Sequence, residues 1–132
     1  MTPIDTVHRI YDAFGRGDIP FILSCLDPEV DWEYGMVDAG VPWLQHRRGH
    51  AGAQAFFGAL AAFEISEFIP RAILGAGPLV VAVIDLKATV KATGRDVSEE
   101  HEVHLWHFNE AGLVTRFCHK LDTYQHWRAL QP

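Results

Sequence analysis

The stretch LVVAVIDLKATVKATGRDVSEEHEVHLWHFNEAGLVTRFCHKL, residues 79–121, decides the fold because its apolar segments are long and its interruptions are short. Three segments are rich in the β-branched and aromatic residues that favour strands: residues 79–92, 97–108 and 113–121. The turn sequences between them, around Gly94 and at 109–112, are short enough to make neighbouring strands antiparallel. We therefore expect three consecutive hairpin-connected strands.

The sequence before this stretch adds one more strand of the same kind and then changes to helical patterns. Residues 65–74 form an apolar segment that ends at a glycine- and proline-containing turn, which extends the meander to four strands. Apolar residues at helical spacing predict three earlier helices: one from Pro3 to Gly15, one after Asp18 and one from about His50. Between the last two, EVDWEY (29–34) alternates like a strand, and residues 35–49 read as a loop.

The end of the chain predicts one further short helix. Asp122 and Gln125 have the spacing of a helix-capping box, and Tyr124, Trp127 and Leu130 follow at helical spacing. Helices that come first and antiparallel strands that follow are typical of an α+β domain. Strands of this length curl, so we expect a cone-shaped curved antiparallel sheet wrapped by three N-terminal helices.

Length and composition restrict the class of protein. A chain of 132 residues with 48% hydrophobic and 21% charged residues fits one globular domain, residues 1–132. The formal net charge of −6 disfavours a grip on nucleic-acid phosphates, and no apolar run is long enough for a membrane span. The two cysteines, Cys25 and Cys118, form no disulfide framework, and the N-terminus does not read as a signal peptide. We expect a cytoplasmic protein that contacts neither nucleic acid nor membrane.

The order of these elements resembles the SnoaL-like branch of the nuclear transport factor 2-like superfamily. Relatives in that superfamily include ketosteroid isomerase, polyketide cyclase, limonene-epoxide hydrolase and scytalone dehydratase. Five segments carry the resemblance: VHRIYDAFGRGD (7–18), LDPEVDWEY (26–34), RGHAGAQAFFGAL (48–60), VVAVID (80–85) and NEAGLVTRFCHKLDTY (109–124). The resemblance implies a blind apolar pocket inside the curved sheet, and its members share a pocket more than a reaction.

The resemblance also implies which residues face the pocket. On the last strand it points to His119, on the long strand to Asp85, and on the first strand to Trp32 and Tyr34. We expect three of these to be catalytic: His119 as the base, Asp85 as its orienter or a second acid, and Tyr34 as the donor to a developing oxyanion. Further contacts with the substrate are expected from Trp32, Phe14, Tyr11, Trp43 and Leu105.

Other interpretations of these residues stay open. Asp85 can be a solvated aspartate, His119 a core histidine bonded to a backbone carbonyl, and Trp32 a packing residue. The motif HEVHLWH (101–107) invites a metal site, but on a regular strand His101 and His107 face one side and His104 the other. We therefore predict no metal ligands and no cofactor.

Two functions from different classes compete. The first is a cofactor-free isomerase, cyclase or dehydratase that acts by acid–base chemistry on a small, largely apolar, oxygenated substrate. The alternative is a non-catalytic protein that holds a small apolar ligand in the same pocket. Hydrogen-bond contact between Asp85 and His119 would favour the enzyme, whereas placement on opposite faces of the sheet would favour the binding protein.

Two further expectations follow from the resemblance. Epoxide hydrolysis of the limonene type is disfavoured, because the position of its arginine is occupied by Val83. A homodimer is expected, with the sheet face bearing His104, Trp106 and Phe108 turned outward against a second copy, since that face is too apolar to stay in water.

Overall fold

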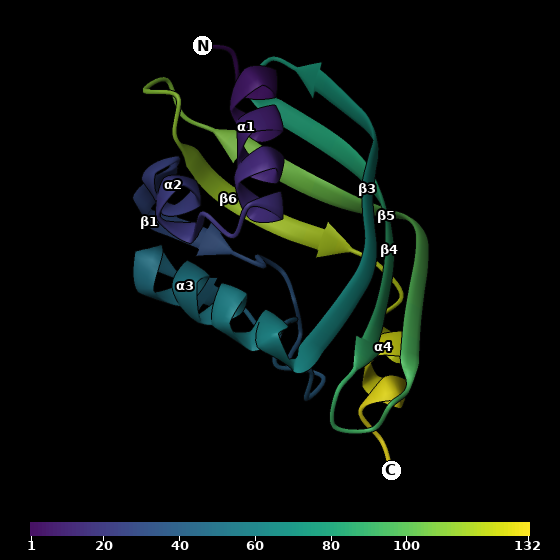
Figure 1. The fold of residues 1–132 in the computed structure, drawn as a ribbon. Helices are drawn as coiled ribbons and strands as arrows, with labels where there is room; N and C mark the ends of the chain where they lie inside the picture. The colour runs from purple at the N-terminus through teal and green to yellow at the C-terminus, as the bar shows by residue number, and fades with distance from the viewer.

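The computed structural model describes residues 1–132 and contains four α-helices, one short 3-10 helix and six strands. In chain order these are α1 (Pro3–Gly15), α2 (Ile19–Ser24), β1 (Leu26–Trp32), β2 (Arg47–Arg48), α3 (Gly49–Ala59), the 3-10 helix (Leu60–Ala62), β3 (Phe63–Ala76), β4 (Leu79–Val90), β5 (Asp96–Phe108), β6 (Val114–Lys120) and α4 (Thr123–Ala129). Three helices lie on one side of a strongly curved sheet, and α4 lies near its far end (Figure 1). The predicted α+β architecture is confirmed. No helix is both long and apolar enough to cross a membrane.

The six strands form one sheet in the order β2-β1-β6-β5-β4-β3. The four strands from β3 to β6 pair antiparallel as the predicted meander. The first strand differs from the expectation in two ways: β1 begins at Leu26 and ends at Trp32, and it pairs parallel with β6. The expected loop also contains β2, a two-residue strand that pairs antiparallel with β1.

The first helix is fixed at its start and along its length. Thr2 accepts a hydrogen bond from the backbone of Asp5, and the Asp5 carboxylate accepts one from the backbone of Thr2, which completes the capping box. The helix then packs closely on β3 at Gly75, where an added Cβ would lie 2.5 Å from Cδ1 of Ile4. The start of α1 therefore lies directly against β3 at this position.

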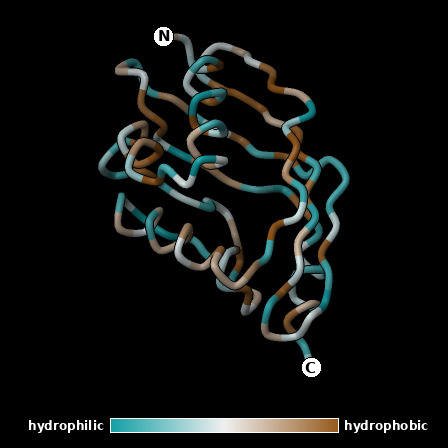
Figure 2. Tube along the Cα trace, in the orientation of Figure 1, coloured by the Kyte–Doolittle hydropathy of each residue, from teal (hydrophilic) through white to brown (hydrophobic).

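Side chains of the long strands alternate between a buried concave face and a partly exposed outer face. Hydrophobic and hydrophilic residues accordingly follow one another along the strands (Figure 2). On β4 the buried residues occupy every second position from Val80 to Val90. Four of them, Val80, Leu86, Ala88 and Val90, belong to one cluster of buried side chains that spans the helices and the sheet, so the concave side contains the hydrophobic core.

The orientation expected for the β5 residues is wrong. His104, Trp106 and Phe108 are buried on the concave side, whereas Val103, Leu105 and His107 alternate with them on the outer face. The physical reason is the register: His104 pairs with Ala82, and Trp106 pairs with Val80, both buried. Paired residues of an antiparallel sheet share a face.

Candidate active site

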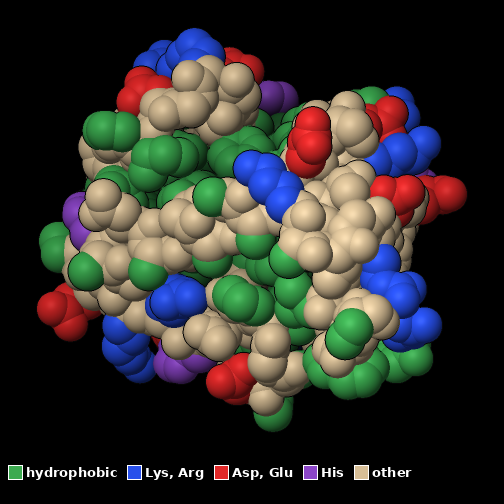
Figure 3. Space-filling model, turned by 60° about the horizontal axis from the view of Figure 1, so that its bottom comes forward, with side chains coloured by type: hydrophobic (Ala, Val, Ile, Leu, Met, Phe, Trp, Pro, Cys, Tyr) green, Lys and Arg blue, Asp and Glu red, His purple; other side chains and the backbone are tan.

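A narrow, mostly apolar cavity lies between the concave side of the sheet and the helices. Of the 21 residues that line it, 17 are hydrophobic, and the polar ones are Glu102, His104, His119 and His126. It leaves about 70 Å³ for the centres of water-sized molecules, enough for several waters or a slim organic ligand. Hydrophobic side chains are visible in the recesses of the face shown in Figure 3.

Five of the eight expected site residues line this cavity. They are His119, Trp32, Phe14, Tyr11 and Trp43. The other three, Asp85, Tyr34 and Leu105, are absent from its wall. For Leu105 the reason is its position on the outer face of β5, opposite Val81.

Tyr34 is outside the cavity because the backbone turns at the residue before it. Glu33 has a positive φ of 58°, which ends the alternation of β1 directly after Trp32. The Tyr34 hydroxyl hydrogen-bonds Nε2 of His107 at 2.6 Å, and the guanidinium of Arg116 lies 3.9 Å from the centre of its ring. Burial raises the pKa of Tyr34 to about 12. The expected oxyanion donor is therefore a residue of the outer face.

Asp85 is also on the outer face, since Ile84 and Leu86 point inward on either side of it. Its carboxylate accepts hydrogen bonds from Nε of Arg71 at 2.7 Å and from the backbone of His101 at 3.0 Å. The hydrogen bond from Arg71 and that from His101 hold the pKa of Asp85 below its ordinary value. The expected contact between Asp85 and His119 is wrong, and the observed position is the one that favours the binding protein.

A different carboxylate occupies the place next to His119. Oε1 of Glu33 accepts hydrogen bonds from Nδ1 of His119 at 2.7 Å and from its backbone N–H at 2.8 Å. The Glu33 side chain is fully buried, and the other ring nitrogen of His119, Nε2, has no hydrogen-bond partner in the protein. The left-handed turn that moves Tyr34 out thus directs Glu33 in.

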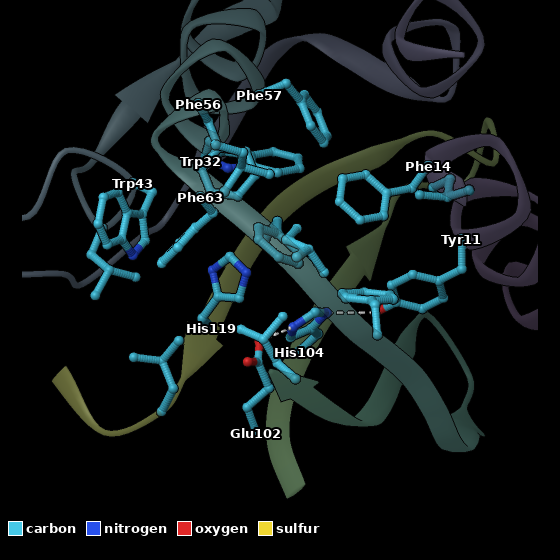
Figure 4. Close-up of a pocket in the computed structure, with 18 of the residues that line it drawn as sticks. Tyr11, Phe14, Trp32, Trp43, Phe56, Phe57, Phe63, Glu102, His104 and His119 are labelled. Atoms are coloured by element: carbon cyan, nitrogen blue, oxygen red, sulfur yellow. Dashed lines mark hydrogen bonds and ion pairs between the residues drawn. The ribbon is translucent and has the colours of Figure 1, made fainter. Parts of the chain in front are cut away.

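A second chain of polar groups crosses the cavity from β5 to α1. The indole N–H of Trp106 donates to the Tyr11 hydroxyl at 3.0 Å, and this hydroxyl lies 2.7 Å from Nδ1 of His104. At the other side of the ring, Nε2 of His104 lies 2.6 Å from Oε2 of Glu102. Figure 4 shows Tyr11, His104 and Glu102 in a row, with His119 beside them and the aromatic side chains beyond.

The directions of the hydrogen bonds in this chain follow from the indole donor together with the protonation state of His104. An indole N–H can only donate, so the Tyr11 hydroxyl accepts from Trp106. Burial and the charge on His119 lower the pKa of His104, which favours its neutral form. In that form Tyr11 donates to Nδ1, Nε2 donates to Glu102, and neither nitrogen of His104 is free.

The two neighbouring imidazoles have opposite pKa shifts. Their rings meet edge to face with centres 4.5 Å apart. Burial, together with the charge on His119, lowers the pKa of His104. Burial disfavours a charge on His119 as well, but the adjacent Glu33 outweighs it and raises the pKa of His119. Two titratable groups whose pKa values are shifted in opposite directions can take different roles in proton transfer.

A third histidine pair connects the loop before β2 to α4. The indole N–H of Trp43 donates to Nδ1 of His126 at 2.8 Å, and Nε2 of His126 donates to Glu99 at 3.0 Å. Glu99 also accepts from the backbone of Asp122, at the start of α4. Because the indole can only donate, Nδ1 of His126 is the acceptor of this bond.

Three of the cavity residues could also approach a metal ion. Glu102, His104 and His119 each offer a ligand atom within 4.8 Å of the others. The proton shared between His104 and Glu102 would have to leave before a metal could enter between them, since their 2.6 Å separation is that of a hydrogen bond. The hydrogen bond between His104 and Glu102 therefore favours a site for proton transfer over a site for a metal ion.

Sequence reasoning missed Glu33, Glu102 and His104. Glu102 faces the cavity because β5 contains a bulge: His101 has a positive φ of 66°, and the pairing with β4 shifts between Ile84 and Leu86. Glu99 and Glu102, three residues apart, are consequently both buried. The only available signal for Glu102 was the group of acidic residues at 99, 100 and 102 within a predicted strand.

The family of the chain is established by its sequence. Residues 7–117 match the model of the SnoaL-like domain. The protein belongs to this family. The assignment of all 132 residues to one SnoaL-like domain stays a prediction. No curated protein matches the sequence.

Solved structures of similar proteins agree with this assignment. A nuclear transport factor 2-like protein of unknown function from Burkholderia pseudomallei K96243 is 26% identical, with a TM-score of 0.82 and coverage of 100% of both chains. Another, from Burkholderia thailandensis E264, is 25% identical with a TM-score of 0.85, and the match covers 100% of this chain and 99% of that one. TerC, crystallised with polyporic acid, is 24% identical with a TM-score of 0.73 and 96% coverage of both chains, which shows the shared fold alone.

Proposed function

We propose that this SnoaL-like protein is an isomerase, cyclase or dehydratase that works by side-chain acid–base chemistry on a small, largely apolar, oxygenated substrate. The observation that carries the proposal is the His119–Glu33 pair at the wall of the cavity. Glu33 holds the proton of His119 on Nδ1, so Nε2 has a lone pair that can accept a proton from the substrate. The imidazolium formed is then stabilised by the carboxylate 2.7 Å away.

The cavity supplies the other requirements of such a reaction. Aromatic side chains exclude water and can stack on a flat substrate. The indole Nε1 of Trp32, a donor in the cavity wall, is buried without an acceptor. We assign it the role of donating to a substrate oxygen, in place of Tyr34. The proton taken by His119 is then returned to another atom of the same substrate, which balances the reaction without any external acid or base.

Similarity in fold supports the choice of ligand. TerC, which shares this fold, was co-crystallised with polyporic acid. For this chain, a small and mostly apolar ligand is part of the proposal. Cofactor-free catalysis is a part of it as well.

Proton exchange with solvent tests the proposal and does not require the natural substrate. A panel of small enolisable ketones and hydroxylated aromatic ketones is incubated with the protein in D₂O and followed by proton NMR. We expect catalysed loss of a C–H signal for at least one compound, and a decrease of about 10²-fold or more in His119→Gln. Exchange that proceeds equally in His119→Gln would show that this residue is not the base.

The second candidate function is ligand binding without catalysis. The observation in its favour is the position of Asp85, which lies on the opposite face of the sheet from His119. The same experiment separates the two: ligands that bind to the cavity while none of them exchanges a proton would favour the binding protein.

We also infer a homodimer, formed through the outer face of the sheet, and a cytoplasmic location. Val81, Val83 and Leu105 are partly buried apolar residues of that face, and pairing with a second copy would remove them from water. Both cysteines are free thiols, which agrees with a reducing compartment. Light scattering at micromolar concentration should show a dimer that becomes a monomer in Leu105→Glu. A monomeric wild-type protein would contradict the dimer.

A further inference from the structure

The charges in the cavity do not balance. Two carboxylates, Glu33 and Glu102, lie beside it, and Glu33 has a charge partner in His119. The partner of Glu102 is His104, whose neutral form is favoured by burial and by the charge on His119, which lower its pKa. Burial would raise the pKa of Glu102, but the hydrogen bond from His104 and the nearby histidines outweigh it and lower that pKa. Glu102 is therefore an ionised carboxylate, and the nearby cation, His119, is already hydrogen-bonded to Glu33.

The same carboxylate lacks a hydrogen bond. Its side chain is only 3% exposed, and while Oε2 accepts from His104, Oε1 has no partner in the protein. A buried ionised oxygen without a donor is costly, because burial removes its water and nothing replaces it. The wall of the cavity contains no lysine or arginine that could donate a hydrogen bond to this oxygen.

We propose that the ligand of this cavity is an organic cation: a flat apolar body with a protonated amine at the end that reaches Glu102. An ammonium N–H donates to Oε1 and neutralises its charge, without disturbing the proton between His104 and Glu102. The aromatic rings around the cavity, among them Tyr11, Phe68 and Phe117, favour a cation over an anion because their faces are electronegative. This inference rests on the proposed use of the cavity as the ligand site, but not on catalysis.

The test compares three probes of one shape that differ in charge at pH 7. Benzylamine is a cation, benzyl alcohol is neutral and benzoate is an anion, and their binding to EDTA-treated protein is measured by isothermal titration calorimetry. We expect benzylamine to bind at least about tenfold more tightly than benzyl alcohol, as hydrogen bonds to charged groups predict, with benzoate the weakest. Benzoate binding as tightly as benzylamine, or all three binding alike, would overturn the proposal.

Substitution of Glu102 tests whether this residue causes the preference for benzylamine. In Glu102→Gln we expect the advantage of benzylamine to disappear, while benzyl alcohol binds within about twofold of its wild-type affinity, since only the charged hydrogen bond is lost. Glu110→Gln, which removes the same charge from an exposed turn, is the matched control and should leave the order unchanged. An advantage of benzylamine that persists in Glu102→Gln would contradict the assignment.

Two further results separate the proposed ligand class from a metal site and from the proposed enzyme activity. If Zn²⁺ binds in a Glu102-dependent manner and benzylamine does not, the missing charge belongs to a metal and the proposal is wrong. If benzylamine binds as expected but no compound exchanges a proton in D₂O, the ligand class stands and the proposed enzyme activity fails. Because the order of the three probes is measured first on the wild-type protein, a misfolded variant does not remove the test.

Discussion

The buried carboxylate of Glu33 accepts hydrogen bonds from both the ring Nδ1 and the backbone N–H of His119, at 2.7 Å and 2.8 Å. These two bonds fix the orientation of the ring and leave Nε2 as its only free nitrogen. The proposed base is therefore oriented by a residue 86 positions away in sequence, at the end of the strand that pairs with its own.

Replacing Glu33 with glutamine should reduce catalysis without removing the acceptor. Glutamine can keep a hydrogen bond to Nδ1 but cannot stabilise the imidazolium, so we expect proton exchange in D₂O to slow by about 10- to 100-fold, the scale of one or two pKa units. The control is Glu29→Gln, an exposed change on the same strand. Exchange at the wild-type rate in Glu33→Gln would separate this carboxylate from catalysis.

The Tyr11 hydroxyl should matter more for stability than the Tyr34 hydroxyl. Tyr11→Phe leaves both the Trp106 indole and Nδ1 of His104 without partners inside the core, which should lower the free energy of unfolding by about 1–3 kcal/mol. Tyr34→Phe removes one hydrogen bond, to His107 on the outer face, and should cost less. Urea denaturation of both variants makes the comparison, and a larger loss in Tyr34→Phe would contradict the hydrogen-bond chain.

Asp85→Asn should leave the chemistry of the cavity unchanged. Asp85 contacts Arg71 and the backbone of the bulged residue His101, both away from His119, so we expect exchange rates within about twofold of wild type, the scatter of surface substitutions. Its lowered pKa adds a pH effect on stability. The contribution of this carboxylate is complete above the unfolded-state pKa of about 3.9 and is lost as the pH falls through the folded value. Loss of proton exchange in Asp85→Asn would restore the role expected from the sequence.

Trp43→Phe should loosen the contact between the loop before β2 and α4. Phenylalanine keeps an aromatic ring in the cavity wall but leaves Nδ1 of His126 without its donor. We expect faster amide hydrogen exchange in residues 35–46 and in α4, and a loss of about 1–3 kcal/mol of stability. Trp127→Phe, on the exposed side of α4 at 40% exposure, serves as the control. Equal effects of the two substitutions would show that the hydrogen bond to His126 contributes little.

The meander and the helices could be predicted from the sequence because their signals are local. The long strands end at recognisable turns, and the capping residues Thr2 and Asp122 mark where helices begin. The position of His119 on the concave face was implied by the family resemblance, and it could be carried over because β6 shows no irregularity from Arg116 to Lys120.

The carboxylates of the site could not be predicted, because each depends on a local break in that alternation. Glu33 itself has a left-handed backbone conformation, and a glycine, the usual sequence signal for that conformation, does not stand at this position. The side chain of Glu33 points inward and that of Tyr34 points outward as a result. The bulge at His101 shifts the phase of β5, which brings Glu102 to the cavity. Asp85 was assigned to the cavity from a family position, whereas its neighbours Ile84 and Leu86 are the residues that point inward.

The measurement that tests the central claim most directly is a residue-by-residue NMR titration of the histidine rings. The Glu33 carboxylate stabilises the charged form of His119, so this ring should titrate above the ordinary value of about 6.5 and shift to lower pH in Glu33→Gln. His104, buried and held neutral, should titrate below that value. His119 would then lose its proton, and become active as a base, as the pH rises through its raised pKa. If instead His104 titrates above His119, or if Glu33→Gln leaves His119 unchanged, the assignment of His119 as the proton-transfer group is wrong.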